Sequence, residues 1–133
     1  MLNCSHGNLG VAATLAGLAL ASPAHAVELD QVLGRWGNAD GAYDCKAEAG
    51  TETAPVKIET DGGGFYVSAY AWGCTVKAPQ WRGDLIGGEA SCGSEGDGEI
   101  TSGHIELGLT ATGQLLLTRD GMAETLDRCV ARQ

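Results

Sequence analysis

The amino-acid sequence predicts an all-β fold: a small antiparallel barrel of six to eight short strands, held by two disulfides and preceded by a signal peptide. Three observations support this prediction. From Val27 onward, apolar residues recur at every second position, which is typical of strands that bury one face. Glycine-containing turns separate these segments at intervals of roughly 8 to 12 residues, as they do in sandwiches and barrels. An even number of cysteines lies in the same region, which favours disulfides in an exported chain.

Residues 1–26 of the 133-residue chain are expected to form the signal peptide. An uncharged apolar run over residues 9–21 is followed by Ala24-His25-Ala26, the small-x-small pattern after which signal peptidases cut. The run is too short to span a bilayer comfortably, and it has no polar face at the spacing of a core helix. Cleavage after Ala26 would leave residues 27–133 as a single barrel domain, for which we expect no membrane insertion.

The first half of this domain contains the clearest strand signals. Residues 29–36 favour one or two helical turns, which Gly34 ends. The first strand is expected over 54–60, where apolar and charged residues alternate before an Asp-Gly-Gly-Gly turn. The most β-prone run of the chain, 65–78, follows this turn and continues until Pro79.

An extended run over 65–78 would have two unlike faces. One face would carry Phe65, Val67, Ala69 and Ala71, and the other Tyr66, Ser68, Tyr70, Trp72 and Cys74. Two interpretations of the second face stay open. Turned inward, it makes an aromatic core in which Cys74 packs beside Trp72. Turned outward, it makes an aromatic patch of the kind that marks binding surfaces, with Tyr66, Tyr70 and Trp72 as candidate binding residues.

The second half predicts a weaker strand and then a meander. Residues 84–92 alternate less well, and their two adjacent glycines suggest a bend or bulge. Residues 93–99 are predicted to be a polar loop. Three further strands are expected to be joined by Ala-Thr-Gly and Asp-Gly turns, and they cover 104–110, 114–119 and 123–130.

The cysteine pairing is predicted from the closure of the barrel. Pairing the first strand with the last removes the exposed edges of a small sheet, and it would bring Cys45 close to Cys129. Cys74 and Cys92 would then join across a hairpin that turns near Gly83. We therefore expect the disulfides Cys45–Cys129 and Cys74–Cys92, with the two other pairings left open. A four-cysteine zinc site is disfavoured because no C-x-x-C pair is present.

The charge of the chain limits its partners. Seventeen Asp and Glu residues against eight Lys and Arg give a formal net charge of −9, and all of these residues follow position 26. Nucleic acid is not expected as a partner, because phosphate contacts require clustered cations. An anionic membrane surface would repel the chain for the same reason. A basic protein is the natural electrostatic complement.

Little in the sequence points to catalysis. After residue 26 the chain has one histidine, His104, which we expect to be exposed and idle at the start of an apolar strand. Serines at 91, 94 and 102 could supply a nucleophile, but no Gly-x-Ser-x-Gly elbow surrounds them. A redox role is disfavoured by the lack of C-x-x-C. We therefore expect no enzyme, no catalytic residue and no cofactor.

An acidic loop is the second candidate binding element. Glu95, Asp97 and Glu99 occupy alternate positions of the segment Ser-Glu-Gly-Asp-Gly-Glu at 94–99. Such a loop could hold calcium, but it lacks the spacing and the distal bidentate Glu of an EF-hand loop. We therefore expect a solvated acidic loop without metal, and we count its three carboxylates among the candidate binding residues.

Two resemblances bear on function. Gly34-x-Trp36 resembles the start of lipocalin and avidin-like barrels, and in avidins an Asn in the place of Asn38 would touch biotin. The chain also resembles the small periplasmic β-barrel inhibitors of Gram-negative bacteria. It is similar to the metalloproteinase inhibitors in its export signal, early Gly-x-Trp, early Cys and length, and to the lysozyme inhibitors in its acidity, size and Tyr43-Asp44-Cys45. It departs from the latter in lacking their Ser-Gly-x-x-Tyr loop, for which 102–107 is a poor substitute, and its four-cysteine layout differs from both.

The resemblance and the charge imply a non-enzymatic binding or inhibitory protein, periplasmic or secreted, that caps a basic hydrolase such as lysozyme. The acidic loop at 94–99 would occupy a cationic rim of that enzyme. One alternative is a lipocalin-like carrier of a small ligand, and another is a structural protein of the envelope. The state of the barrel interior separates the first two, because a small barrel filled by side chains leaves little room for a ligand.

Overall fold

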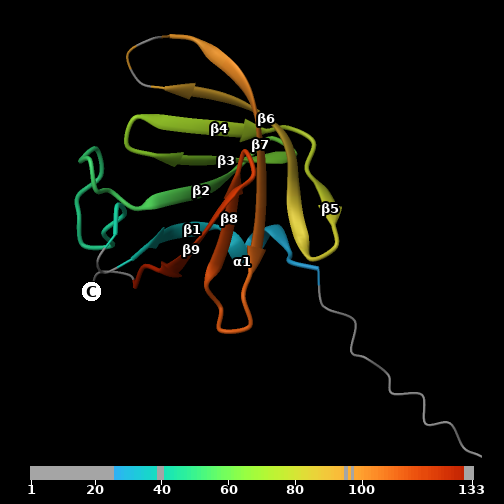
Figure 1. Cartoon of the computed structure of the whole chain (residues 1–133), viewed down its shortest axis with the longest axis horizontal. Helices are drawn as coiled ribbons and strands as arrows, with labels where there is room; N and C mark the ends of the chain where they lie inside the picture. The colour runs from blue at the N-terminus through green and yellow to red at the C-terminus, as the bar shows by residue number, and fades with distance from the viewer. Residues whose placement is uncertain (1–25, 39–40, 95, 97, 131–133) are drawn as a thin grey trace, which may run out of the picture.

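The computed structural model describes residues 26–38, 41–94, 96 and 98–130. These residues form a closed antiparallel barrel of eight strands, with a ninth short strand beside it (Figure 1). The predicted fold class is therefore confirmed. The predicted signal peptide lies outside the described residues, apart from Ala26.

The order of the strands in the barrel follows the order of the chain. The elements are α1 (Leu29–Val32), β1 (Gly34–Gly37), β2 (Val56–Asp61), β3 (Gly64–Ala69), β4 (Trp72–Val76), β5 (Gln80–Arg82), β6 (Leu85–Ser94), β7 (Ile100–Leu109), β8 (Leu115–Arg119) and β9 (Met122–Arg128). Strands that are neighbours in sequence pair with each other, except β4 and β5. Instead, β4 pairs with the second part of β6, and β1 pairs with β9. The expected pairing of the first strand with the last closes the barrel, and β5 pairs with the first part of β6.

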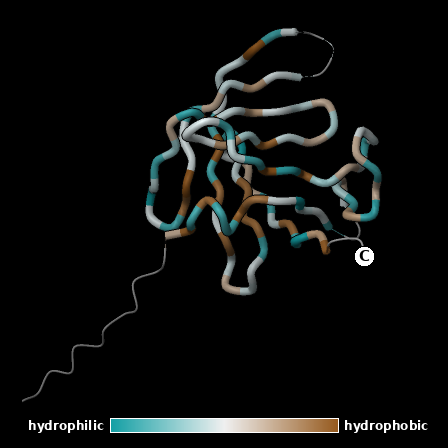
Figure 2. The backbone as a smooth tube through the Cα atoms, turned by 180° about the vertical axis from the view of Figure 1, so that it is seen from behind, coloured by the Kyte–Doolittle hydropathy of each residue, from teal (hydrophilic) through white to brown (hydrophobic). Residues whose placement is uncertain are grey.

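The alternation in the sequence reflects the two sides of the barrel wall. In β2, Val56 and Ile58 are buried in the interior, whereas Lys57 and Glu59 face outward and form an ion pair of 2.9 Å. This alternation of hydrophobic and hydrophilic residues can be followed along β2 in Figure 2. This separation of faces is what allows so short a chain to enclose a core.

The prediction of one long strand over 65–78 is wrong, because the chain turns back at Tyr70 and Ala71. Ala69 and Trp72 are direct partners across the resulting β3–β4 hairpin, and Ala71 has φ +68°. Two residues that pair across a two-residue turn face the same side of a sheet. Trp72 and Cys74 therefore lie on the inner side with Val67, and not on the outer side with Tyr66.

Strands β6 and β7 are longer than the sequence suggested. The backbone ladder between them continues to the pair Gly93 and Ile100, so that the predicted loop 93–99 shrinks by two residues at its start. The adjacent glycines mark the point where β6 changes its second partner from β5 to β4. A side chain at Gly87 would collide with the Ile105 carbonyl, and Gly88 has φ +151°, so both positions favour glycine.

Both predicted disulfides are present. Cys45–Cys129 joins the segment after β1 to the residue after β9, with a Cα–Cα distance of 5.2 Å. Cys74–Cys92 joins directly paired residues of β4 and β6, with a Cα–Cα distance of 4.1 Å. Two such bonds indicate an oxidising compartment outside the cytoplasm. Within the described part of the chain, we find no helix with the length and apolar character needed to cross a membrane.

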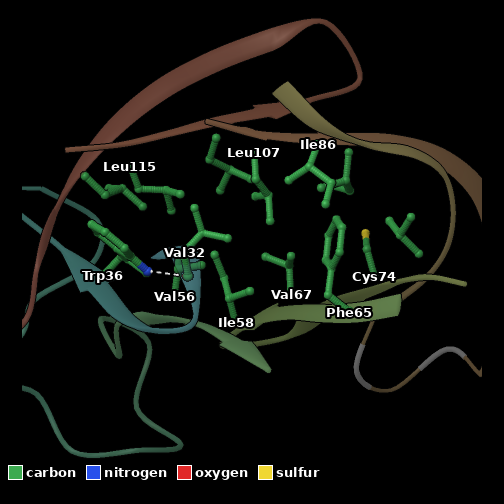
Figure 3. Close-up of a cluster of buried hydrophobic side chains, with 14 of the residues drawn as sticks. Val32, Trp36, Val56, Ile58, Phe65, Val67, Cys74, Ile86, Leu107 and Leu115 are labelled. Atoms are coloured by element: carbon green, nitrogen blue, oxygen red, sulfur yellow. Dashed lines mark hydrogen bonds between the residues drawn. The ribbon is translucent and has the colours of Figure 1, made fainter. Parts of the chain in front are cut away.

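Trp36 closes one end of the barrel. Its side chain is fully buried, and its Nε1–H donates to the carbonyl of Val32 in α1 at 2.9 Å (Figure 3). The guanidinium of Arg128 lies 4.2 Å from the centre of the Trp36 ring and donates to the carbonyls of Leu33 and Gln31. The helix, the ring and the arginine thus hold one another in place, in a cation–π arrangement that also satisfies the end of α1.

A second tryptophan is covered by an arginine from the other end of the β8–β9 hairpin. Arg119 precedes the β8–β9 turn, whereas Arg128 ends β9, so the two arginines are at opposite ends of this hairpin. The Arg119 guanidinium lies 4.1 Å from the centre of the Trp72 ring. Trp72 is partly exposed but packs against the core. Each end of the β8–β9 hairpin therefore places an arginine over a tryptophan of the core.

Large apolar side chains fill the interior of the barrel (Figure 3). Phe65, Ile58 and Leu107 are each fully buried or nearly so, and they belong to one continuous cluster that includes Trp36 and Cys74. A packed interior of this kind behaves as a hydrophobic core and not as a ligand cavity.

Candidate functional site

The predicted aromatic residues occupy three different environments around the β3–β4 hairpin. Tyr66 is half-buried on the outer side of β3 and lies against Gly73 of β4, where a side chain would collide with its ring. Tyr70 is 42% exposed at the turn. Trp72 lies at the inner side and packs under Arg119. The three residues are neighbours, but they do not share one face.

The acidic loop is only partly described. Glu95 and Asp97 lie outside the described residues, and Glu99 is exposed directly before β7. Ser94, with which β6 ends, pairs with Trp72, so the acidic segment begins beside the β3–β4 turn. The described start of the acidic segment, Ser94, therefore lies beside the turn that carries Tyr70.

An outward-facing hollow of about 400 Å³ lies on this side of the barrel wall. Its floor contains Gly73 and Gly93, which are direct partners across β4 and β6. Tyr66 forms one wall, and Ile100, which is 73% exposed, forms another. The hollow exists because the two paired glycines have no side chain, whereas the residues around them cover the outer surface with theirs.

A second hollow, of about 730 Å³, adjoins the first and shares Thr75 and Ser91 with it. It continues across β6 and β7 to His104, Glu89 and Asp120. We call the two hollows together the outer trough; Tyr66, Gly73, Gly93, Ser91, Ser102 and His104 mark its course. Sequence reasoning did not find it, because its lining comes from strands whose register is set by tertiary pairing.

His104 is exposed, as the sequence predicts, and its side chain makes a specific contact. It lies within β7, and its Nε2 is 3.1 Å from Oε1 of Glu106. The Glu106 carboxylate also receives two hydrogen bonds from Arg82, at 2.9 and 2.6 Å. The Glu106 side chain is only 7% exposed, whereas those of Arg82 and His104 are 75% and 48% exposed. The arginine and the histidine thus cover an outward-facing carboxylate.

Arg82 holds the pKa of Glu106 below its ordinary value of 4.5, mainly through the side-chain hydrogen bond, with a smaller contribution from His104. Burial acts in the opposite direction. Because the pKa is lower in the folded state than in the unfolded chain, the carboxylate stabilises the fold above its ordinary titration range. This stabilisation is lost as the pH falls through the lowered value.

Replacing Arg82 with alanine is expected to raise the pKa of Glu106 and to lower the melting temperature by a few degrees at neutral pH. The difference from the wild type should shrink as the pH falls through the lowered pKa of Glu106, because below it the carboxylate is protonated in both proteins. Side-chain NMR titration of Glu106 and thermal unfolding at several pH values measure the two effects. A melting-temperature difference that stays constant into the acid range would contradict this role of the ion pair.

Asn38, the residue that the avidin-like resemblance singles out, lies just after β1. It lines a hollow of about 290 Å³ beside Asp44, Cys45 and Asp127. Its backbone N–H donates to the carbonyl of Tyr43 at 2.6 Å. Its side-chain oxygen is buried without a hydrogen-bond partner among the described residues. The hollow adjoins the Cys45–Cys129 disulfide and not the filled interior.

The described side chains include no group of three or more metal-ligating residues. What the structure offers is the outer surface of a filled barrel: a trough with a floor of small residues, close to the turn that exposes Tyr70. Such a surface is suited to binding. Comparisons of the chain with protein-family models, with curated proteins and with solved structures found no match.

Proposed function

We propose that this chain is a non-enzymatic binding protein of the periplasm or the extracellular space, and that it caps a basic hydrolase, with lysozyme as the first enzyme to test. The filled interior is the observation that supports this proposal most directly. Because buried side chains fill the barrel interior, binding falls to the outer surface and the loops. The same observation argues against a small ligand carried inside the barrel.

The distribution of charge favours a cationic partner. Several of the cations are already engaged within the protein: Arg119 and Arg128 cover tryptophans, and Arg82 pairs with Glu106. Lys57 pairs with Glu59. Acidic side chains such as Asp61 and Glu124 are exposed. With a formal net charge of −9, the surface attracts a basic protein over distance and raises its rate of encounter.

The proposed mechanism is occlusion. The segment 94–99 begins beside the turn that exposes Tyr70, because Ser94 is the direct partner of Trp72. Carboxylates of this segment would engage the cationic rim of the enzyme, while Tyr66 and Tyr70 supply apolar contact. Aromatic residues often provide much of the binding energy of a protein interface.

A lysozyme lysis assay at low and high salt tests this proposal. The protein should inhibit at stoichiometric concentration, and inhibition should weaken as salt screens the charges. A triple variant, Glu95→Gln with Asp97→Asn and Glu99→Gln, should raise the inhibition constant about tenfold. A charge-matched control, Asp30→Asn with Asp61→Asn and Glu124→Gln, should raise it much less. Lysozyme activity that is unchanged by the wild-type protein at low salt would remove lysozyme as the partner and favour a structural role in the envelope.

A further inference from the structure

We infer that the outer trough receives an extended segment of the basic partner and places one of its lysine or arginine side chains between Glu89 and Asp120. This inference rests on the proposed function for the class of partner, but it names the contact surface.

The floor of the trough has the shape that an extended chain needs. Gly73 and Gly93 face each other across β4 and β6, and Gly93 is paired in turn with Ile100 of β7. Two adjacent strands therefore lack outward side chains at the same level. Tyr66 and Ile100 stand on either side of this gap, so that the depression has apolar walls and a backbone floor.

A row of hydroxyl groups continues the floor. Thr75, Ser91 and Ser102 are direct partners across β4, β6 and β7. Their hydroxyls make no hydrogen bond to any described residue. Such groups can both donate and accept, as the peptide groups of an extended segment require. The row lies where the two hollows join, because Thr75 and Ser91 line both.

The far end of the trough carries negative charge that the protein does not neutralise. Glu89 is the cross-strand partner of His104, and it makes no ion pair with a described residue. Asp120 accepts the backbone N–H of His104 at 2.8 Å, an interaction that leaves its charge uncompensated. Lys77 also lines this hollow, so the two carboxylates outnumber the lysine. A cationic side chain is therefore the complementary occupant.

An NMR titration of the ¹⁵N-labelled protein with a tetralysine peptide at low ionic strength tests this inference. The amide signals of Gly88, Ser91 and Gly103 should shift in a saturable way. Chitotriose, an uncharged sugar that serves as the control, should not shift them. Glu89→Gln should raise the dissociation constant of the peptide about fivefold. The matched control Glu124→Gln, which removes the same charge from β9, should leave binding almost unchanged.

A second pair of variants tests the shape of the trough. The Gly93→Thr variant should fold normally. Its dissociation constant for the peptide should be about tenfold higher than that of the wild type. A Cβ at Gly93 would lie at ordinary contact distances, 3.5 Å from Ile100 Cδ1 and 3.7 Å from the Glu99 carbonyl, and threonine suits a strand. The control Gly63→Thr places the same side chain in open space at the β2–β3 turn and should have no effect on binding.

Peptide shifts confined to other parts of the surface, equal effects of Glu89→Gln and Glu124→Gln, or shifts of the trough signals by chitotriose would each overturn the inference. The two proposals can fail separately. Trough binding of tetralysine without inhibition of lysozyme would support the trough and reject lysozyme. Inhibition of lysozyme that is unaffected by Glu89→Gln and Gly93→Thr would do the reverse.

Discussion

Replacing Trp36 with alanine is expected to lower the free energy of unfolding by about 3 to 5 kcal/mol, the usual cost of removing a large, fully buried aromatic side chain. Three interactions are lost together. The core loses the packing of the ring, the Val32 carbonyl loses its donor, and Arg128 loses the surface that it covers. A loss of this size is a large part of the stability of a small domain.

Urea denaturation followed by far-UV circular dichroism measures this effect. Trp81→Ala is the matched control, because Trp81 is 53% exposed and its main specific interaction is one hydrogen bond to the Val27 carbonyl. That variant should lose about 1 kcal/mol. The loss of unfolding free energy for Trp36→Phe should lie between those of the two alanine variants, because phenylalanine keeps an aromatic ring but lacks the Nε1 donor. Equal losses for Trp36→Ala and Trp81→Ala would show that Trp36 does not close the barrel as described.

Removing the Cys45–Cys129 disulfide by a double substitution with serine is expected to cost about 4.5 kcal/mol. The bond joins residues 84 positions apart, so it strongly restricts the unfolded chain, by the chain-entropy account of disulfide stabilisation. It also fastens the segment after β1 to the end of β9, at the pairing that closes the barrel. We expect its loss to bring the protein close to unfolding at elevated temperature.

The Cys74–Cys92 bond provides the comparison. Its residues are 18 positions apart, and the same account gives about 3 kcal/mol for its removal. Chemical denaturation of the two double-serine variants, under conditions in which the remaining bond stays oxidised, gives both values. If loss of Cys74–Cys92 destabilised the protein more than loss of Cys45–Cys129, chain entropy would not be the main source of the stabilisation. The burial of Cys74 would then explain the larger loss.

The sequence contained enough information for the architecture and the cysteine pairing. Period-two alternation and glycine turns identify strands because a barrel wall has one dry side and one wet side. The pairing of Cys45 with Cys129 followed from the need to join the two edges of the sheet. The turn at Tyr70 and Ala71 was missed because it contains none of the residues that favour left-handed turns, and alternation appears continuous through it.

The candidate site was harder to predict, for two reasons. The missed turn exchanged the two sides of the following strand, so the aromatic face assumed for Tyr66, Tyr70 and Trp72 does not exist as a unit. The contact of Arg82 with Glu106 depends on the register between β6 and β7 and on the short hairpin that β5 makes with β6. Register across a barrel is set by packing and closure, which no local pattern of residues records.

The bond between Cys45 and Cys129 has one more consequence, for a molecule exposed to proteases. A cut in any loop between these two residues divides the polypeptide but releases no fragment, because both pieces stay tied by sulfur at the seam of the barrel. Nicked molecules would migrate as a single species on a non-reducing gel and separate only after reduction. The architecture thus tolerates damage to its backbone without coming apart.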